Sequence, residues 1–148
     1  MQAIEFKNVI FSYRSGDGDQ AEITEVLKSI NFSVEKGRFI ALLGKNGSGK
    51  STAARLINGL LKPVSGTVTV LGKDVSDKNN LFEVRKSVGM VFQNPDNQQI
   101  ASIVEDDVAF GPENIGMPRE EIGRAIDFAL KVTDMEKFRH SEAAKLSG

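Results

Sequence analysis

The stretch Gly44-Lys45-Asn46-Gly47-Ser48-Gly49-Lys50-Ser51 indicates more about the fold than any other part of the chain. It fits the pattern Gly-x-x-x-x-Gly-Lys-[Ser/Thr], a glycine-rich loop whose backbone cradles the phosphates of a nucleoside triphosphate. An apolar run of strand length, Phe39–Leu43, precedes the loop, and residues 51–58 can continue it as a helix. Strand, loop and helix in this order are the context in which the pattern binds nucleotide. The stretch therefore predicts a phosphate-binding loop.

Each residue type in this loop has a chemical reason. A polyphosphate needs several converging N–H donors, and a backbone free of Cβ atoms can wrap it most closely. A helix beginning near Lys50 adds unpaired N–H groups and the positive end of its dipole. We expect the Lys50 ammonium to contact the β- and γ-phosphates and the Ser51 hydroxyl to bind Mg²⁺. The residues expected to contact the nucleotide phosphates are Gly44, Asn46, Gly47, Ser48, Gly49, Lys50, Ser51 and Thr52.

Composition narrows the function classes. The 148 residues suit one domain, and the contents of 40% apolar and 26% charged residues are ordinary for a soluble protein. The net charge of −1 provides no basic surface, so nucleic acid is not an expected partner. The absence of cysteine excludes disulfides and thiolate metal sites and agrees with a reducing cytosol. No apolar stretch is long enough to cross a bilayer, so we expect any membrane role to come through a partner.

The first part of the chain is rich in predicted strands. We expect a strand from Ile4 to Tyr13 with a break near Asn8-Val9, and another in the second half of residues 26–34. After the helix, a β-branched strand is predicted over residues 67–71, and a short apolar strand over residues 88–92.

The second part of the chain is expected to be helical from Val104 onward. The clearest helix runs from Pro118 to Thr133, with an apolar face at helical spacing. Residues 1–98 therefore form the predicted nucleotide-binding part, and residues 99–148 a helical subdomain. The acidic run Glu105-Asp106-Asp107 has two interpretations, a solvated first helical turn favoured by the helix dipole or a contact with a partner. His140, the one histidine, is predicted to be a surface residue.

Four features in order resemble the ATP-binding subunit of an ABC transporter over the whole chain. They are Tyr13 after the first strand, the phosphate loop, Gln93 after an apolar strand, and Leu146-Ser147-Gly148. The resemblance implies an α/β fold: a P-loop NTPase core, an antiparallel β sub-sheet and a helical subdomain. It further implies that adenine stacks on Tyr13, and that Gln93 contacts Mg²⁺ together with Ser51 and senses the membrane subunit. Lys50 and Gln93 are the implied catalytic residues.

The resemblance also concerns the partners. Residues 91–98 and 105–114 are most similar to the ATPases of energy-coupling factor transporters, which take up vitamins and transition-metal ions. In that family two ATPases sandwich ATP, so Ser147 and Gly148 would serve the γ-phosphate held by the partner ATPase. A transmembrane coupling protein and a substrate-binding membrane protein complete the complex. The implied location is the cytoplasmic face of the cell membrane.

The family pattern continues beyond the signature Leu-Ser-Gly-Gly-Gln, of which this chain carries the first three residues. The family's next strand ends in Asp-Glu, which holds Mg²⁺ and supplies the general base, and a catalytic histidine follows later. We therefore expect the fold to be incomplete at its C-terminal end, and the 148 residues alone to bind nucleotide with hardly any hydrolysis.

Two other functions stay open. A DNA-repair or chromosome-organising ATPase of the same superfamily would usually carry a long coiled-coil insertion between Gln93 and the signature. That interval is short here and holds no sustained heptads. The second alternative is a nucleotide-binding module without turnover, which acts as a regulator or is simply a fragment.

Overall fold

The computed structural model describes residues 1–16, 22–94 and 98–146. Contacts between Cα atoms divide the chain into two compact units, Met1–Met90 and Val91–Gly148. This division falls earlier in the chain than the boundary at residue 98 predicted for the nucleotide-binding part. Each unit is described by itself below.

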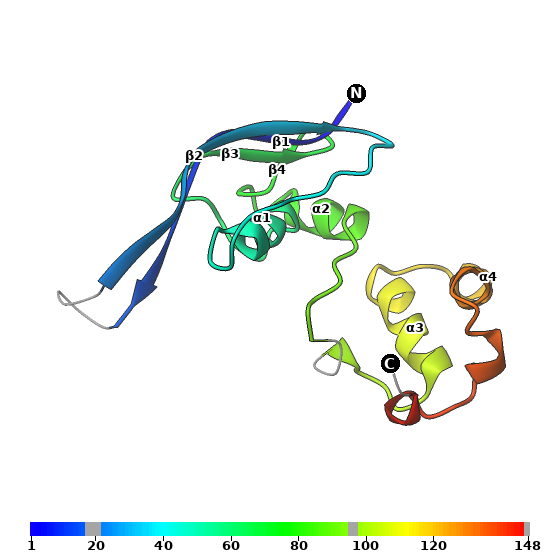
Figure 1. The fold of residues 1–148 in the computed structure, drawn as a ribbon. Coiled ribbons are helices and arrows are strands. Elements are labelled where there is room, and N and C mark those ends of the chain that lie inside the picture. Colours follow the sequence, from blue (N-terminus) through cyan, green and yellow to red (C-terminus); the bar gives the residue numbers. More distant parts are fainter. Residues whose placement is uncertain (17–21, 95–97, 147–148) are drawn as a thin grey trace. The chain divides into compact units, whose positions relative to one another are not determined.

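The first unit contains a four-stranded antiparallel sheet in the order β2-β1-β3-β4. Beyond Ile10, β1 pairs with β2 and no longer with β3. The ends of β1 and β2 therefore form a two-stranded arm that extends past the rest of the sheet (Figure 1). The strands are β1 (Gln2–Ser15), β2 (Glu22–Glu35), β3 (Ser65–Val70) and β4 (Lys73–Asp74).

The break predicted near Asn8-Val9 is a bulge within one continuous strand. Asn8 has a positive φ of 50°, and its N–H donates to Asn31 Oδ1 at 2.8 Å. The pairing of β1 shifts between Phe6 and Val9 against β2. Gly66 of β3 faces the bulge at a φ of 80°, where a Cβ atom would collide with the Asn8 carbonyl oxygen. Only a glycine lets the third strand pass the bulge so closely.

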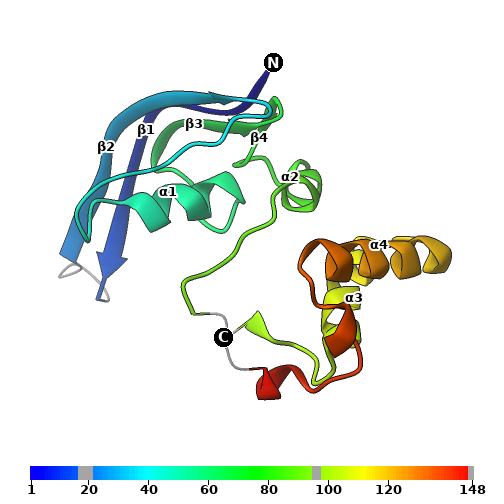
Figure 2. The ribbon, with the colours of Figure 1, turned by 45° about the vertical axis from the view of Figure 1, so that its right-hand side comes forward.

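Two helices, α1 (Lys50–Ile57) and α2 (Leu81–Ser87), lie on the same side of this sheet (Figures 1 and 2). Their buried residues, Leu56 of α1 and Val84 of α2, pack into one core with the side chains of the sheet. The helix α1 confirms the helix predicted after the phosphate loop, whereas α2 and β4 were not predicted. The buried core consists of Phe6, Val9, Phe11, Leu27, Ala53, Leu56, Val68, Val70, Val75 and Val84.

Two predicted strands are wrong. Residues 38–45 and 88–92 adopt no strand in the structure. An apolar run becomes a strand only when a neighbouring strand completes its backbone hydrogen bonds. Within the described residues, neither segment has such a neighbour. Phe39 and Leu43 are consequently 95% and 89% exposed.

The second unit is helical, as predicted. The helix α3 (Val104–Asn114) begins at the predicted residue, and α4 (Arg119–Val132) begins one position after Pro118. Two short 3-10 helices follow, η3 (Glu136–Phe138) and η4 (Ala143–Lys145). A separate small core is formed by Val104, Ala109, Ile126 and Leu130. Among the described residues, no helix has the length and apolar character needed to span a membrane.

Candidate nucleotide-binding site

The glycine-rich loop leads directly into α1. Gly49 is the N-cap residue of this helix, with φ 90° and ψ 6°, and no side chain caps the helix. A Cβ atom on Gly49 would lie 2.6 Å from Leu27 Cδ2 and 3.1 Å from Val26 Cγ1. Both the backbone conformation and the contact with β2 therefore require glycine at this position.

The N–H groups at the start of α1 are available to a ligand. The loop is closed by one backbone bond, from Ser48 N–H to the Lys45 carbonyl oxygen at 3.2 Å. Within the described chain, no group accepts a hydrogen bond from the next N–H groups along the backbone. These belong to Gly49, Lys50, Ser51 and Thr52. Unpaired N–H groups at a helix N-terminus favour the binding of an anion, which agrees with the predicted phosphate contacts.

The Lys50 side chain folds back over the loop. Its ammonium donates to the carbonyl oxygens of Gly44 and Lys45, both at 2.8 Å. The positive charge thus lies at the loop itself. An ammonium held by neutral carbonyls can exchange them for the charged oxygens of a phosphate, which form stronger bonds.

Tyr13 and Thr52 are brought together although 39 positions separate them in the sequence. Tyr13 lies on the arm of β1 and β2, and its hydroxyl shares a hydrogen bond of 3.1 Å with Thr52 Oγ1. The ring packs edge-on against Phe11 and is 38% exposed. The aromatic residue predicted to stack on the base therefore lies beside the first turn of α1.

Thr52 takes part in this arrangement in a way that the sequence did not indicate. It is 5% exposed, and its hydroxyl is bonded to Tyr13. Any contact of Thr52 with phosphate consequently falls to its backbone N–H rather than to its side chain.

The two predicted metal ligands belong to different units of the chain. Ser51 is exposed at the start of α1, and Gln93 is an exposed residue of the other unit. Ser147 and Gly148 lie outside the described residues. Among the described residues, no three His, Cys, Asp or Glu side chains group as metal ligands. The sharing of Mg²⁺ by Ser51 and Gln93 stays a prediction, as does the signature contact.

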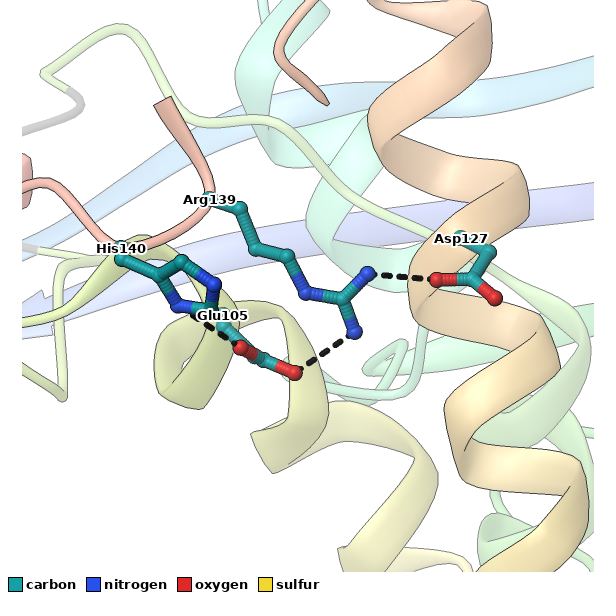
Figure 3. A network of polar contacts seen from close by, with 4 residues as sticks. All are labelled: Glu105, Asp127, Arg139 and His140. Atoms are coloured by element: carbon teal, nitrogen blue, oxygen red, sulfur yellow. Dashed lines mark hydrogen bonds and ion pairs between the residues drawn. The ribbon is translucent and has the colours of Figure 1, made fainter. Parts of the chain in front are cut away.

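The acidic run at the start of α3 has partners within its own unit. Arg139 binds Glu105 and, on α4, Asp127, each at 2.6 Å (Figure 3). This guanidinium holds the pKa of Glu105 below its usual range. Asp107 Oδ1 accepts the N–H groups of Ile100 at 2.8 Å and of Ala101 at 2.9 Å. These carboxylates therefore stabilise the fold of the unit, and a contact with a partner stays a prediction.

His140 is 80% exposed, which confirms its prediction as a surface residue. Its Nδ1 lies 3.2 Å from Glu105 Oε2. His140 thus lies at the edge of the Arg139 cluster, which consists of Arg139, Glu105 and Asp127. Sequence reasoning did not find this cluster, because positions 105, 127 and 139 follow no common helical or strand period.

Comparison with known proteins places these features in a family. The family model described as ABC transporter matches residues 27–148. The energy-coupling factor transporter ATP-binding protein EcfA1 of Caldanaerobacter subterraneus subsp. tengcongensis is 48% identical over 145 residues, which are 98% of this chain and 51% of that protein. The corresponding EcfA of Methanocaldococcus jannaschii is 48% identical over 149 residues, covering 100% of this chain and 51% of that protein. The chain thus spans about half the length of these curated relatives.

Solved structures agree in fold. The structure of cbiO1 from Clostridium perfringens, described as part of the ABC transporter complex cbiONQ, has a TM-score of 0.82 and 35% identity. The alignment covers 99% of this chain and 56% of that one. The ATP-binding cassette MJ0796, solved as a dimer in a post-hydrolysis state with ADP and phosphate, has a TM-score of 0.80 and 28% identity, covering 97% of this chain and 63% of that one.

Proposed function

The chain belongs to the ABC transporter family, and from this premise we propose that it is the nucleotide-binding part of an ATPase that powers an energy-coupling factor importer. The proposal rests on the glycine-rich loop at the start of α1 and on the 48% identity to ATP-binding proteins of such transporters. The imported substrates would be vitamins or transition-metal ions, selected by a separate membrane protein.

The nucleotide is ATP. Its adenine stacks on the half-exposed ring of Tyr13. Its phosphates accept hydrogen bonds from the unpaired N–H groups of residues 49–52, at the start of α1. The Lys50 ammonium exchanges the carbonyl oxygens of Gly44 and Lys45 for β- and γ-phosphate oxygens. The short distance between the arm and α1 supports this arrangement, because the Tyr13 hydroxyl already contacts Thr52.

Mg²⁺ is the metal that accompanies the nucleotide. When bound, it would supply positive charge against the charge that develops on the phosphates during phosphoryl transfer. Ser51 fits this role because its hydroxyl is exposed in the first turn of α1, next to the unpaired N–H groups. We assign Gln93 as the second protein group that reaches the metal.

Two copies of the ATPase, or two related ATPases, sandwich the nucleotides. Ser147 and Gly148 of one subunit then serve the γ-phosphate held by the other. The dimeric state of the cassette that holds ADP and phosphate supports this proposal. A transmembrane coupling protein and a substrate-binding membrane protein complete the assembly at the cytoplasmic face, in line with the description of cbiO1 as part of a transporter complex.

ATP hydrolysis by the complete protein, with and without its membrane partners, tests this function. We expect hydrolysis that disappears in Lys50→Ala and uptake of a vitamin or metal ion that depends on it. Nucleotide binding without hydrolysis in the complete protein would instead favour a regulatory module.

A further inference from the structure

The segment that leads to the signature residues is attached to the start of α3. Its backbone carbonyls at Arg139 and Ser141 accept the N–H groups of Glu105 at 3.0 Å and of Val104 at 3.1 Å. In return, Ala143 N–H donates to the Ser102 carbonyl oxygen at 2.8 Å. Residues 139–143 therefore run alongside residues 102–105, and an antiparallel bridge pairs Ile103 with Glu142.

These backbone bonds take the place of a side-chain cap at the N-terminus of α3. The N-cap residue of α3, Ile103, has no side chain that can accept a hydrogen bond. The first N–H groups of a helix have no partner within it and need one elsewhere. Here the segment 139–141 supplies that partner. The segment 139–141 is consequently fixed in position relative to the first turn of α3.

The Arg139 side chain extends this attachment to α4. One guanidinium nitrogen, Nη2, lies 2.6 Å from Glu105 Oε1, and the other, Nη1, lies 2.6 Å from Asp127 Oδ1 (Figure 3). Asp127 belongs to α4 and Glu105 to α3. A planar guanidinium can serve two carboxylates at fixed angles, whereas a lysine ammonium acts as a single point charge.

We propose that Arg139 is a positioning residue for ATP turnover, which holds in place the segment 139–146 that leads to the signature. It touches no nucleotide and acts through Glu105 and Asp127. After Arg139 the chain is held by the bonds of Ser141 and Ala143, and Leu146 packs against the core of the helical unit. Leu146 is the first residue of the signature, so a displaced attachment misplaces the start of the motif that serves the partner's γ-phosphate. This inference rests on the proposed function.

The test compares two quantities in the complete protein, the ATP affinity of the isolated subunit and kcat of the assembled ATPase. Arg139→Ala leaves the subunit's own phosphate loop intact, so we expect the Kd for ATP to stay within about twofold, while kcat falls about tenfold to a hundredfold, the range that small misplacements cause. Arg139→Lys keeps one ion pair and should retain an intermediate kcat. Arg124→Ala, on the exposed face of α4, is the matched control and should match the wild type in both quantities.

The outcomes separate the two proposals. A wild-type protein without ATPase activity would overturn the proposed function and, with it, this inference. An active wild type with an unchanged kcat in Arg139→Ala would overturn the positioning role alone. If Arg139→Ala unfolds the helical unit, Arg139→Lys decides: a kcat equal to that of the wild type contradicts the role, and a reduced kcat at unchanged Kd supports it.

Discussion

The hydroxyl of Tyr13 lies 3.1 Å from Thr52 Oγ1 and joins the arm of the sheet to the first turn of α1. Two substitutions separate the contribution of this bond from that of the Tyr13 ring. Tyr13→Phe removes the bond and keeps a ring face, whereas Tyr13→Ala removes both. We expect Tyr13→Ala to lose about 1–3 kcal/mol of stacking on the base, an affinity loss of about five- to 150-fold.

Isothermal titration calorimetry with ATP and GTP measures this difference. Tyr13→Phe should bind both nucleotides nearly as the wild type does, and Tyr13→Ala should weaken both alike, because a ring face accepts any base. Unchanged affinity in Tyr13→Ala would show that Tyr13 is only a packing residue between Phe11 and α1.

Lys50→Ala should weaken ATP binding by about ten- to a hundredfold, since hydrogen bonds to charged groups contribute about 1.5–3 kcal/mol each. The wild-type ammonium lies over the loop on the carbonyls of Gly44 and Lys45, so little rearrangement precedes phosphate binding. Lys28→Ala removes an exposed lysine from β2 and is the control for net charge. Calorimetry that gives the same affinity for Lys50→Ala and Lys28→Ala contradicts the assignment of the loop.

The features predicted correctly depend on local sequence. The loop and α1 follow from one contiguous pattern, and α4 follows from apolar residues repeated at helical spacing. The wrong predictions depend on distant partners. Phe39–Leu43 has the composition of a strand, but a strand forms only with a neighbour, which the described residues do not provide. The bond between Tyr13 and Thr52 and the Arg139 cluster likewise join residues that no sequence period connects.

Gly49→Ala should destabilise the first unit more than Gly47→Ala. Both glycines have positive φ, at 90° and 81°, so each alanine incurs a backbone cost of about 1–2 kcal/mol. The added Cβ at Gly47 meets no atom within 4 Å, whereas that at Gly49 lies 2.6 Å from Leu27 Cδ2. Overpacking against this buried leucine adds about 1–3 kcal/mol. Urea unfolding of the two variants measures the difference, and equal midpoints would argue against the contact of the loop with β2.

The interaction of Glu105 with Arg139 should make the stability of the helical unit depend on pH. The pKa of Glu105 is lowered in the folded state, chiefly by its hydrogen bond to Arg139 and also by the charges of Arg139 and His140, while burial opposes the shift. A lowered pKa contributes stability above the unfolded pKa, and this stability is lost as pH falls through the folded pKa. Arg139 stays charged throughout, because its own pKa is raised further by the two carboxylates.

Carboxyl-detected NMR titration checks this directly. In Arg139→Ala the pKa of Glu105 should rise toward its usual range. The difference in urea midpoint between wild type and variant should shrink as the solution is acidified from neutral pH. A difference that is independent of pH would mean that the ion pair contributes nothing to stability.

The exposed apolar segment Phe39–Leu43 should cause the 148-residue chain to self-associate. Phe39 and Leu43 are almost fully exposed, and Ile40 and Leu42 line an apolar cavity of about 270 Å³ next to α1. An extended apolar segment without a strand partner is a template for pairing with another chain. We expect sedimentation velocity to show a weight-average sedimentation coefficient that rises with protein concentration.

A substitution within Phe39–Leu43 tests whether this segment forms the contact between the associating chains. Burial of one leucine side chain contributes about 1.5–3 kcal/mol, so Leu43→Lys should weaken association by about tenfold or more. Ile23→Lys, at a 71% exposed position on the arm, is the control and should associate as the wild type does. A stable monomer of 148 residues at every concentration would refute this expectation. Both substitutions add one charge to an exposed apolar position, so association that is equally sensitive to Ile23→Lys would indicate a general effect of charge rather than a contact through Phe39–Leu43.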